Sequence, residues 1–126
     1  MTVLLDTSVL IDHLRGNAQA RDALTGAVSD GHRLGASVVV KVEVLAGMRP
    51  AEETPTRGLL DAIEWYPVDD RIAAAAGDLA NRYLRSHPGV DPVDYIVAAT
   101  ATAHDASLWT RNIKHFPMFD GLTSPY

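Results

Sequence analysis

The chain has 126 residues, 47% of them hydrophobic, and its 16 acidic and 11 basic side chains give a formal net charge of -5. The absence of cysteine excludes disulfides, thiolate zinc sites and cysteine nucleophiles, and the acidic balance argues against broad electrostatic binding of nucleic acid. No apolar run reaches the roughly 18 residues that cross a bilayer, and no signal peptide is recognised. We therefore expect one globular domain, residues 1–126, in the cytoplasm and without a membrane partner.

A short apolar run opens the chain and predicts a buried strand at residues 3–5. Ser8 fits the N-cap of a helix that follows at residues 9–14. Asp6 is therefore expected at the carboxyl end of the first strand and beside a helix N-terminus. In open α/β sheets that is the place where ligands bind.

Residues 38–48 give an ambiguous signal. Their β-branched side chains favour a strand. The length of the segment, Ser37 as a possible cap and Gly47 near its end favour a helix, which we predict.

The other segments alternate between helix and strand signals. Pro67 favours an edge position for its strand, and Asp91 and Pro92 fit the N-cap and first position of a helix. Helices are predicted at residues 18–30, 52–63, 70–85 and 92–104, a short turn or helix at 112–116, and strands at 34–37, 65–68, 106–110 and 119–122. This alternation predicts an α/β fold with a mainly parallel sheet of about five strands, flanked by helices on both faces and joined by right-handed crossovers.

Three acidic residues stand at comparable places in this layout. Asp6 ends the first strand, Glu43 lies in the helix after the second strand, and Asp94 lies in the first turn of the helix before the fourth. In a doubly wound sheet all three can meet at the carboxyl edge. Hydroxyl and amide side chains could line the same edge, namely Ser8, Thr110 and Asn112.

Carboxylates that gather at one edge need a partner. Two unit charges about 4 Å apart repel by roughly 4 kcal/mol at an effective dielectric constant near 20, and protonation or a hard divalent cation relieves this. The absence of cysteine and of paired histidines favours magnesium, with manganese as a possible substitute, over zinc. Water held by such an ion can act as the nucleophile in phosphodiester hydrolysis.

Each acidic residue also has a purely structural explanation. Asp6 and Asp94 could simply favour the positive ends of helices, and Asp91 is explained by its N-cap role. Glu43 on an apolar helix is costly if buried and unpaired, so a salt bridge to an arginine is its best structural explanation. Asp12 is interpreted as a solvated helix residue.

The basic residues give no strong pattern. The five histidines show no metal-ligand spacing and are interpreted as surface or loop residues. Four cations could contact phosphates near a groove, although each is more simply an ordinary surface residue: Lys41, Arg49, Arg111 and Lys114.

Four segments match a known family in order and spacing. They read DTS at residues 6–8, SVVVKVEVLAG at 37–47, DYIVAATA at 94–101 and LWTRNIKHF at 108–116. Together they closely resemble the PIN-domain ribonucleases, in particular the VapC toxins of type II toxin–antitoxin systems. The resemblance spans nearly the whole chain. It implies one PIN domain with magnesium-dependent endoribonuclease activity on RNA, a homodimer, and inhibition by a cognate VapB-like antitoxin in a higher-order complex.

The resemblance also implies roles for the acidic residues. Asp6 and Asp94 correspond to metal ligands, and Glu43 to a further ligand or to the group that orients the attacking water. Two positions depart from the family pattern. Val40 stands where threonine is often found, and Asn112 stands at the fourth acidic place, where it should bind a second cation more weakly than aspartate.

Two other functions fit parts of this pattern. Aspartyl-phosphate phosphatases also use an aspartate after the first strand, but they need a second aspartate where this chain has Ser8. A catalytically silent PIN-like interaction module is the alternative from another class. The intact set of Asp6, Glu43 and Asp94 argues against it.

Overall fold

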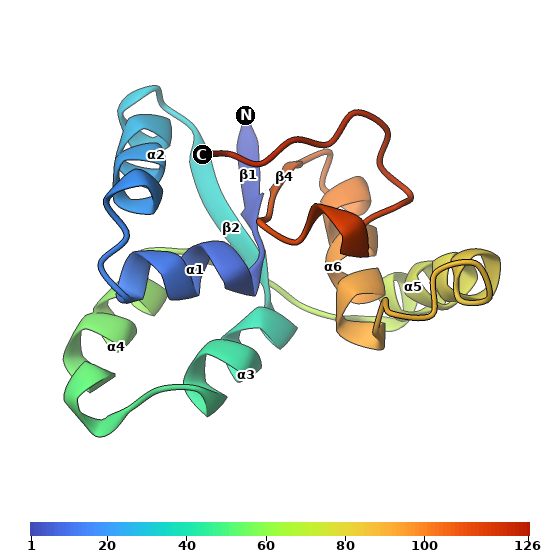
Figure 1. Ribbon diagram of the computed structural model, residues 1–126, viewed down its shortest axis with the longest axis horizontal. Coiled ribbons are helices and arrows are strands. Elements are labelled where there is room, and N and C mark those ends of the chain that lie inside the picture. Colours follow the sequence, from blue (N-terminus) through green and yellow to red (C-terminus); the bar gives the residue numbers. More distant parts are fainter.

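A parallel sheet of four strands forms the centre of the computed structural model, which describes residues 1–126 (Figure 1). The strand order is β3-β2-β1-β4, so β1 lies between β2 and β4 and β3 lies at an edge. In the register, Leu4 pairs with both Gly35 and Leu108. The strands are β1 (Thr2–Leu5), β2 (Arg33–Ser37), β3 (Glu64–Tyr66) and β4 (Ser107–Trp109).

Helices cover both faces of this sheet. Figure 1 shows α1, α2 and α4 on one side and α5 and α6 on the other, which confirms the predicted α/β layering. The helices are α1 (Thr7–Leu14), α2 (Ala18–Ser29), α3 (Val38–Ala46), α4 (Glu53–Asp61), α5 (Asp70–Tyr83) and α6 (Pro92–Ala103), with 3₁₀ turns η1 (Pro50–Glu52) and η2 (Ile113–His115). No helix combines the length and hydropathy that a membrane span requires.

The core lies between the sheet and these helices. Leu4 and Leu5 of β1 are completely buried, as are Val97 and Ala98 of α6. The sequence of α6 is apolar on most of its circumference because α6 packs between the sheet and α5. The two central elements of the molecule, β1 and α6, are therefore fixed by packing, and each presents one aspartate at its end.

The ambiguous segment at 38–48 forms a helix, α3, as predicted. The Ser37 hydroxyl accepts a hydrogen bond from the Val39 N–H at 3.4 Å and caps it. Val40 and Val44 are buried one turn apart, whereas Val42 is 67% exposed. The β-branched run thus supplies one buried stripe, and Val40, at a position where the family often has threonine, packs in the core.

Two predictions about local structure were wrong. The N-cap of α1 is Asp6 rather than Ser8, because the Ser8 hydroxyl is directed to the Asp6 carboxylate instead of the helix backbone. Residues 119–122 form turns rather than a fifth strand, because Gly121 has a φ of 70° and the Phe119 N–H bonds back to the Phe116 carbonyl. The edge position of β3 is confirmed, and Pro67 follows the strand.

Candidate metal centre

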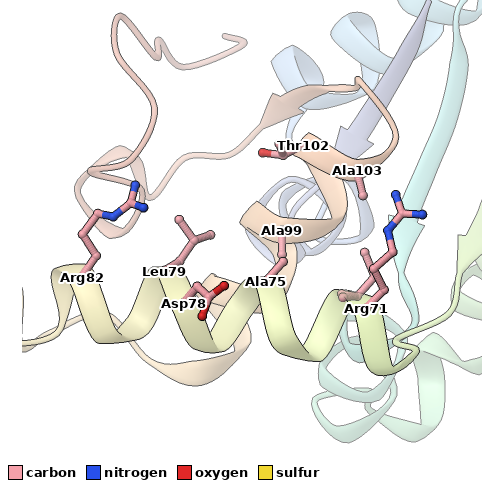
Figure 2. A pocket seen from close by; sticks show the side chains of 9 residues that line it. Arg71, Ala75, Asp78, Leu79, Arg82, Ala99, Thr102 and Ala103 are labelled. Atoms are coloured by element: carbon pink, nitrogen blue, oxygen red, sulfur yellow. The ribbon is translucent and has the colours of Figure 1, made fainter.

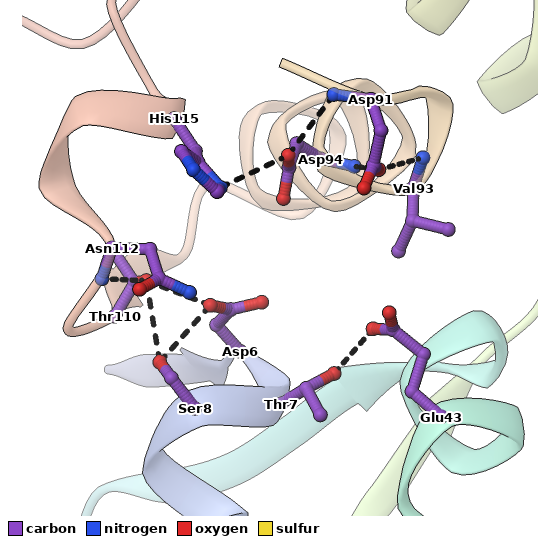
Figure 3. A network of polar contacts seen from close by, with 10 residues as sticks. All are labelled: Asp6, Thr7, Ser8, Glu43, Asp91, Val93, Asp94, Thr110, Asn112 and His115. Carbon is purple, nitrogen blue, oxygen red and sulfur yellow. Dashed lines mark hydrogen bonds and ion pairs between the residues drawn. The ribbon is translucent and has the colours of Figure 1, made fainter. Parts of the chain in front are cut away.

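The carboxylate of Asp6 lies at the carboxyl end of β1, where it is held by two hydroxyl groups (Figure 3). Thr110 Oγ1 donates to Asp6 Oδ2 at 2.7 Å, and Ser8 Oγ donates to the same oxygen at 3.1 Å. Asp6 is only 4% exposed, and its Oδ1 accepts no hydrogen bond. One carboxylate oxygen is therefore fixed by the protein, and the other remains available to a ligand.

The Asp94 carboxylate is fixed in a similar way at the start of α6. Its Oδ2 accepts a hydrogen bond from the Asp91 N–H at 3.2 Å and lies 3.3 Å from His115 Nδ1. Asp91 Oδ1 in turn accepts from the N–H groups of Val93 and Asp94, which completes a capping box. Asp91 is therefore a helix cap, as its sequence position predicts, and the first turn of α6 is rigidly set.

Electrostatics link the two buried aspartates. Burial raises the pKa of Asp94 to about 6, and the negative charges of Asp91 and Asp6 also raise this pKa. The backbone N–H of Asp91 and the neighbouring His115 act in the opposite direction. Neither Asp6 nor Asp94 forms an ion pair with an arginine or lysine. The site thus concentrates negative charge that the protein leaves largely uncompensated.

Glu43 reaches the same region from α3 but is not part of a tight cluster. Its Oε1 accepts a 2.5 Å hydrogen bond from Thr7 Oγ1, and Thr7 directly follows Asp6. Figure 3 shows the carboxyl groups of Asp6, Asp94 and Glu43 facing one region. No three acidic or histidine side chains are close enough to hold a single ion. Glu43 is exposed and makes no ion pair with arginine, so the salt bridge offered as its structural explanation does not form.

The structure also places the other predicted residues. Ser8 and Thr110 both bond to Asp6, and Thr110 is completely buried. Asn112 is exposed and takes part through its backbone, whose N–H donates to Thr110 Oγ1 at 2.9 Å.

Sequence reasoning missed two contributors, Thr7 and His115. Thr7 carries a weak signal, since it directly follows Asp6. His115 carries none, because no sequence spacing relates it to Asp94.

This geometry agrees with a match to the PIN domain family model over residues 3–120. The chain belongs to the PIN-domain family. Ribonuclease VapC19 of Mycobacterium tuberculosis is 44% identical to this PIN domain over 123 residues, which cover 98% of each chain. Ribonuclease VapC10 of the same organism is 45% identical over 124 residues, which cover 98% of this chain and 92% of the relative. The VapC-type resemblance predicted from the four sequence segments is therefore confirmed.

A solved structure shares the fold of this PIN domain over nearly the whole chain. A chain of a toxin–antitoxin complex from Klebsiella pneumoniae superposes with a TM-score of 0.79, with 28% sequence identity and 98% of both chains covered. The family model and this structural neighbour thus agree on the PIN fold of the chain.

Proposed function

We propose that this PIN domain is a divalent-metal-dependent endoribonuclease and the toxin of a type II toxin–antitoxin pair. The observation that carries the proposal is the pair of buried aspartates, Asp6 and Asp94, which have no arginine or lysine partner at the ligand-binding edge of the sheet. Two relatives that match this chain over almost their whole length are named ribonucleases, which supports RNA as the substrate.

The donor set fits a hard divalent cation. Each aspartate has one carboxylate oxygen held by the protein and one that accepts no hydrogen bond. Magnesium prefers oxygen ligands and is usually held by one or two carboxylates together with waters and substrate phosphates. Asp6 and Asp94 would hold Mg²⁺, or Mn²⁺ in its place. When bound, the ion supplies an activated water and stabilises negative charge on a phosphoryl oxygen.

The side chains around the aspartates set the orientation of the reacting groups. Ser8 and Thr110 hold Asp6 from one side, while Asp91 and His115 hold Asp94. Glu43 is exposed and is oriented by Thr7, so it can act as a further ligand or accept a proton from the attacking water. These contacts form before substrate arrives, which is the preorganisation that hydrolysis of a stable phosphodiester requires.

The partners follow from the same proposal. The Klebsiella relative was solved in a toxin–antitoxin complex, which supports a cognate VapB-like antitoxin as the inhibitor of this chain. We extend the proposal to a homodimer that joins the antitoxin in a larger complex and acts in the cytoplasm, where its RNA substrate is found.

A cleavage assay tests the function. Wild-type protein should cleave RNA with Mg²⁺ and lose this activity in EDTA. Asp6→Asn should lower the rate by about a hundredfold or more, because it removes a ligand of the metal that stabilises the transition state. Asp22→Asn, which changes an exposed carboxylate on α2, is the matched control and should cleave like wild type. Equal cleavage by wild type and Asp6→Asn would refute the proposed role of the metal site, whereas no cleavage by the wild-type protein would favour the catalytically silent module.

A further inference from the structure

A basic hollow lies beside the two aspartates. The loop that follows β4 encloses about 300 Å³ and is lined by Arg111, Asn112, Ile113, Lys114 and His115. None of these five residues is acidic and three can carry positive charge, although the chain as a whole has a net charge of -5. His115 contacts Asp94, whereas Lys114 is exposed and forms no ion pair. The hollow therefore offers free positive charge next to the carboxylates.

The backbone of this loop is tied to the aspartate site. The Arg111 N–H donates to Ser8 Oγ at 3.0 Å, and the Asn112 N–H donates to Thr110 Oγ1 at 2.9 Å. Both hydroxyls also hold the Asp6 carboxylate. The start of the loop consequently has a fixed position relative to Asp6, and a ligand in the hollow would be held in register with the metal centre.

The Arg111 side chain is held separately by two residues from distant parts of the chain. Its Nη1 lies 3.8 Å from Asp12 Oδ2, and its guanidinium carbon lies 4.7 Å from the centre of the Tyr126 ring. The Tyr126 hydroxyl donates to the same Asp12 oxygen at 2.7 Å. Burial, followed by the hydrogen bond to Asp12, raises the pKa of Tyr126 to about 12, so the hydroxyl remains a donor at neutral pH. The Arg111 side chain is still 41% exposed and can donate to a ligand.

We propose that this hollow is a phosphate subsite for the RNA strand, in which Arg111 and Lys114 contact backbone phosphates. Asp12 and Tyr126 are positioning residues, because they hold the Arg111 guanidinium at the rim of the hollow. An arginine restrained by an ion pair and an aromatic ring loses less side-chain entropy when it binds phosphate. This subsite rests on the proposed function, since it takes RNA as the ligand of the neighbouring metal centre.

The slope of log affinity against log salt concentration measures how many RNA phosphates the protein contacts. The probe is a fluorescein-labelled single-stranded RNA of mixed sequence, measured by anisotropy with Ca²⁺ in place of Mg²⁺. Arg111→Gln and Lys114→Gln should each weaken binding about fivefold, and each should lower the slope of log affinity against log salt by about 0.7–1. Arg21→Gln removes an equal charge from the exposed face of α2 and should retain the wild-type affinity and slope.

Tyr126→Phe tests the positioning role. It keeps the ring over Arg111 and removes the hydroxyl that fixes Asp12. RNA affinity should fall about threefold, while the thermal midpoint should change by no more than about 2–4 °C. Tyr126→Leu also removes the ring, and its affinity should approach that of Arg111→Gln. A purely structural tyrosine would lower the thermal midpoint and leave RNA affinity unchanged, and that result would overturn the positioning role.

The remaining outcomes separate the subsite from the proposed function. Wild-type affinity and salt slope in Arg111→Gln, with cleavage of RNA intact in the wild type, would overturn the subsite alone. Wild-type protein that neither binds the labelled RNA nor cleaves RNA would overturn the subsite and the proposed function together.

Discussion

Asp94 illustrates a conflict between folding and function at the scale of a single residue. Its pKa rises from 3.8 to about 6 in the folded protein, mainly because the carboxyl is buried. The folded state therefore favours the protonated form, and ionising the group costs stability. This penalty is absent below about pH 3.8 and complete above about pH 6, so the Asp94 contribution to the stability of the metal-free protein falls as pH rises through this window.

This pH dependence gives a measurable prediction. In EDTA at about pH 7.5, Asp94→Asn should be more stable than wild type by about 1–3 kcal/mol, because asparagine keeps an acceptor for the Asp91 N–H without the buried charge. At pH 4 the two proteins should have nearly equal free energies of unfolding. Urea denaturation at both values measures the difference. A stability difference that does not change with pH would show that the Asp94 charge carries no such penalty.

Single residues also show where sequence reasoning succeeds and fails. Asp6 and Asp94 could be predicted because one ends a buried strand and the other lies in the first turn of a helix, and both positions are visible in the sequence. His115 could not be predicted, because its contact with Asp94 depends on how the loop after β4 folds back onto α6. The interpretation of Asp12 as a solvated residue misses its contacts with Arg111 and Tyr126 for the same reason, since both partners are distant in sequence.

At the scale of elements, local signals predicted most helices and strands. The caps predicted at Ser37 and Asp91 are observed, because a side chain that bonds to the next turn is a local interaction. The strand predicted at residues 119–122 does not form. Phe119 and Leu122 are apolar because they pack against the core from a turn, and apolar character alone does not distinguish this from strand pairing.

The contact between β2 and β3 provides a prediction at this scale. A Cβ added at Gly35 would lie 2.5 Å from Cε2 of Tyr66, so the Tyr66 ring must shift in Gly35→Ala. We expect a loss of about 1–3 kcal/mol in the free energy of unfolding. Gly77→Ala is the matched control, because Gly77 lies inside α5 with open space around it. It should gain about 0.5–1 kcal/mol. Equal effects of the two substitutions in urea denaturation would contradict the close packing at Gly35.

At the scale of the whole molecule, the strand order creates the candidate site. Because β1 lies between β2 and β4, the ends of three neighbouring strands bring Asp6, the start of α3 and Thr110 to one edge. Alternating elements and the doubly wound arrangement allowed this convergence to be predicted. They could not predict how far Glu43 extends toward solvent, since helix tilt and side-chain exposure depend on packing between α3 and its neighbours.

Calorimetric titration with Mg²⁺ tests the central claim that Asp6 and Asp94 form a divalent-cation site. Wild-type protein and the Asp22→Asn control should bind the ion with similar affinity at about pH 7.5, where Asp94 is ionised. Asp94→Asn should lose this binding while remaining folded and more stable without metal, so the loss cannot be attributed to unfolding. Mg²⁺ binding to Asp94→Asn with wild-type affinity, or no binding to the wild-type protein, would contradict the account.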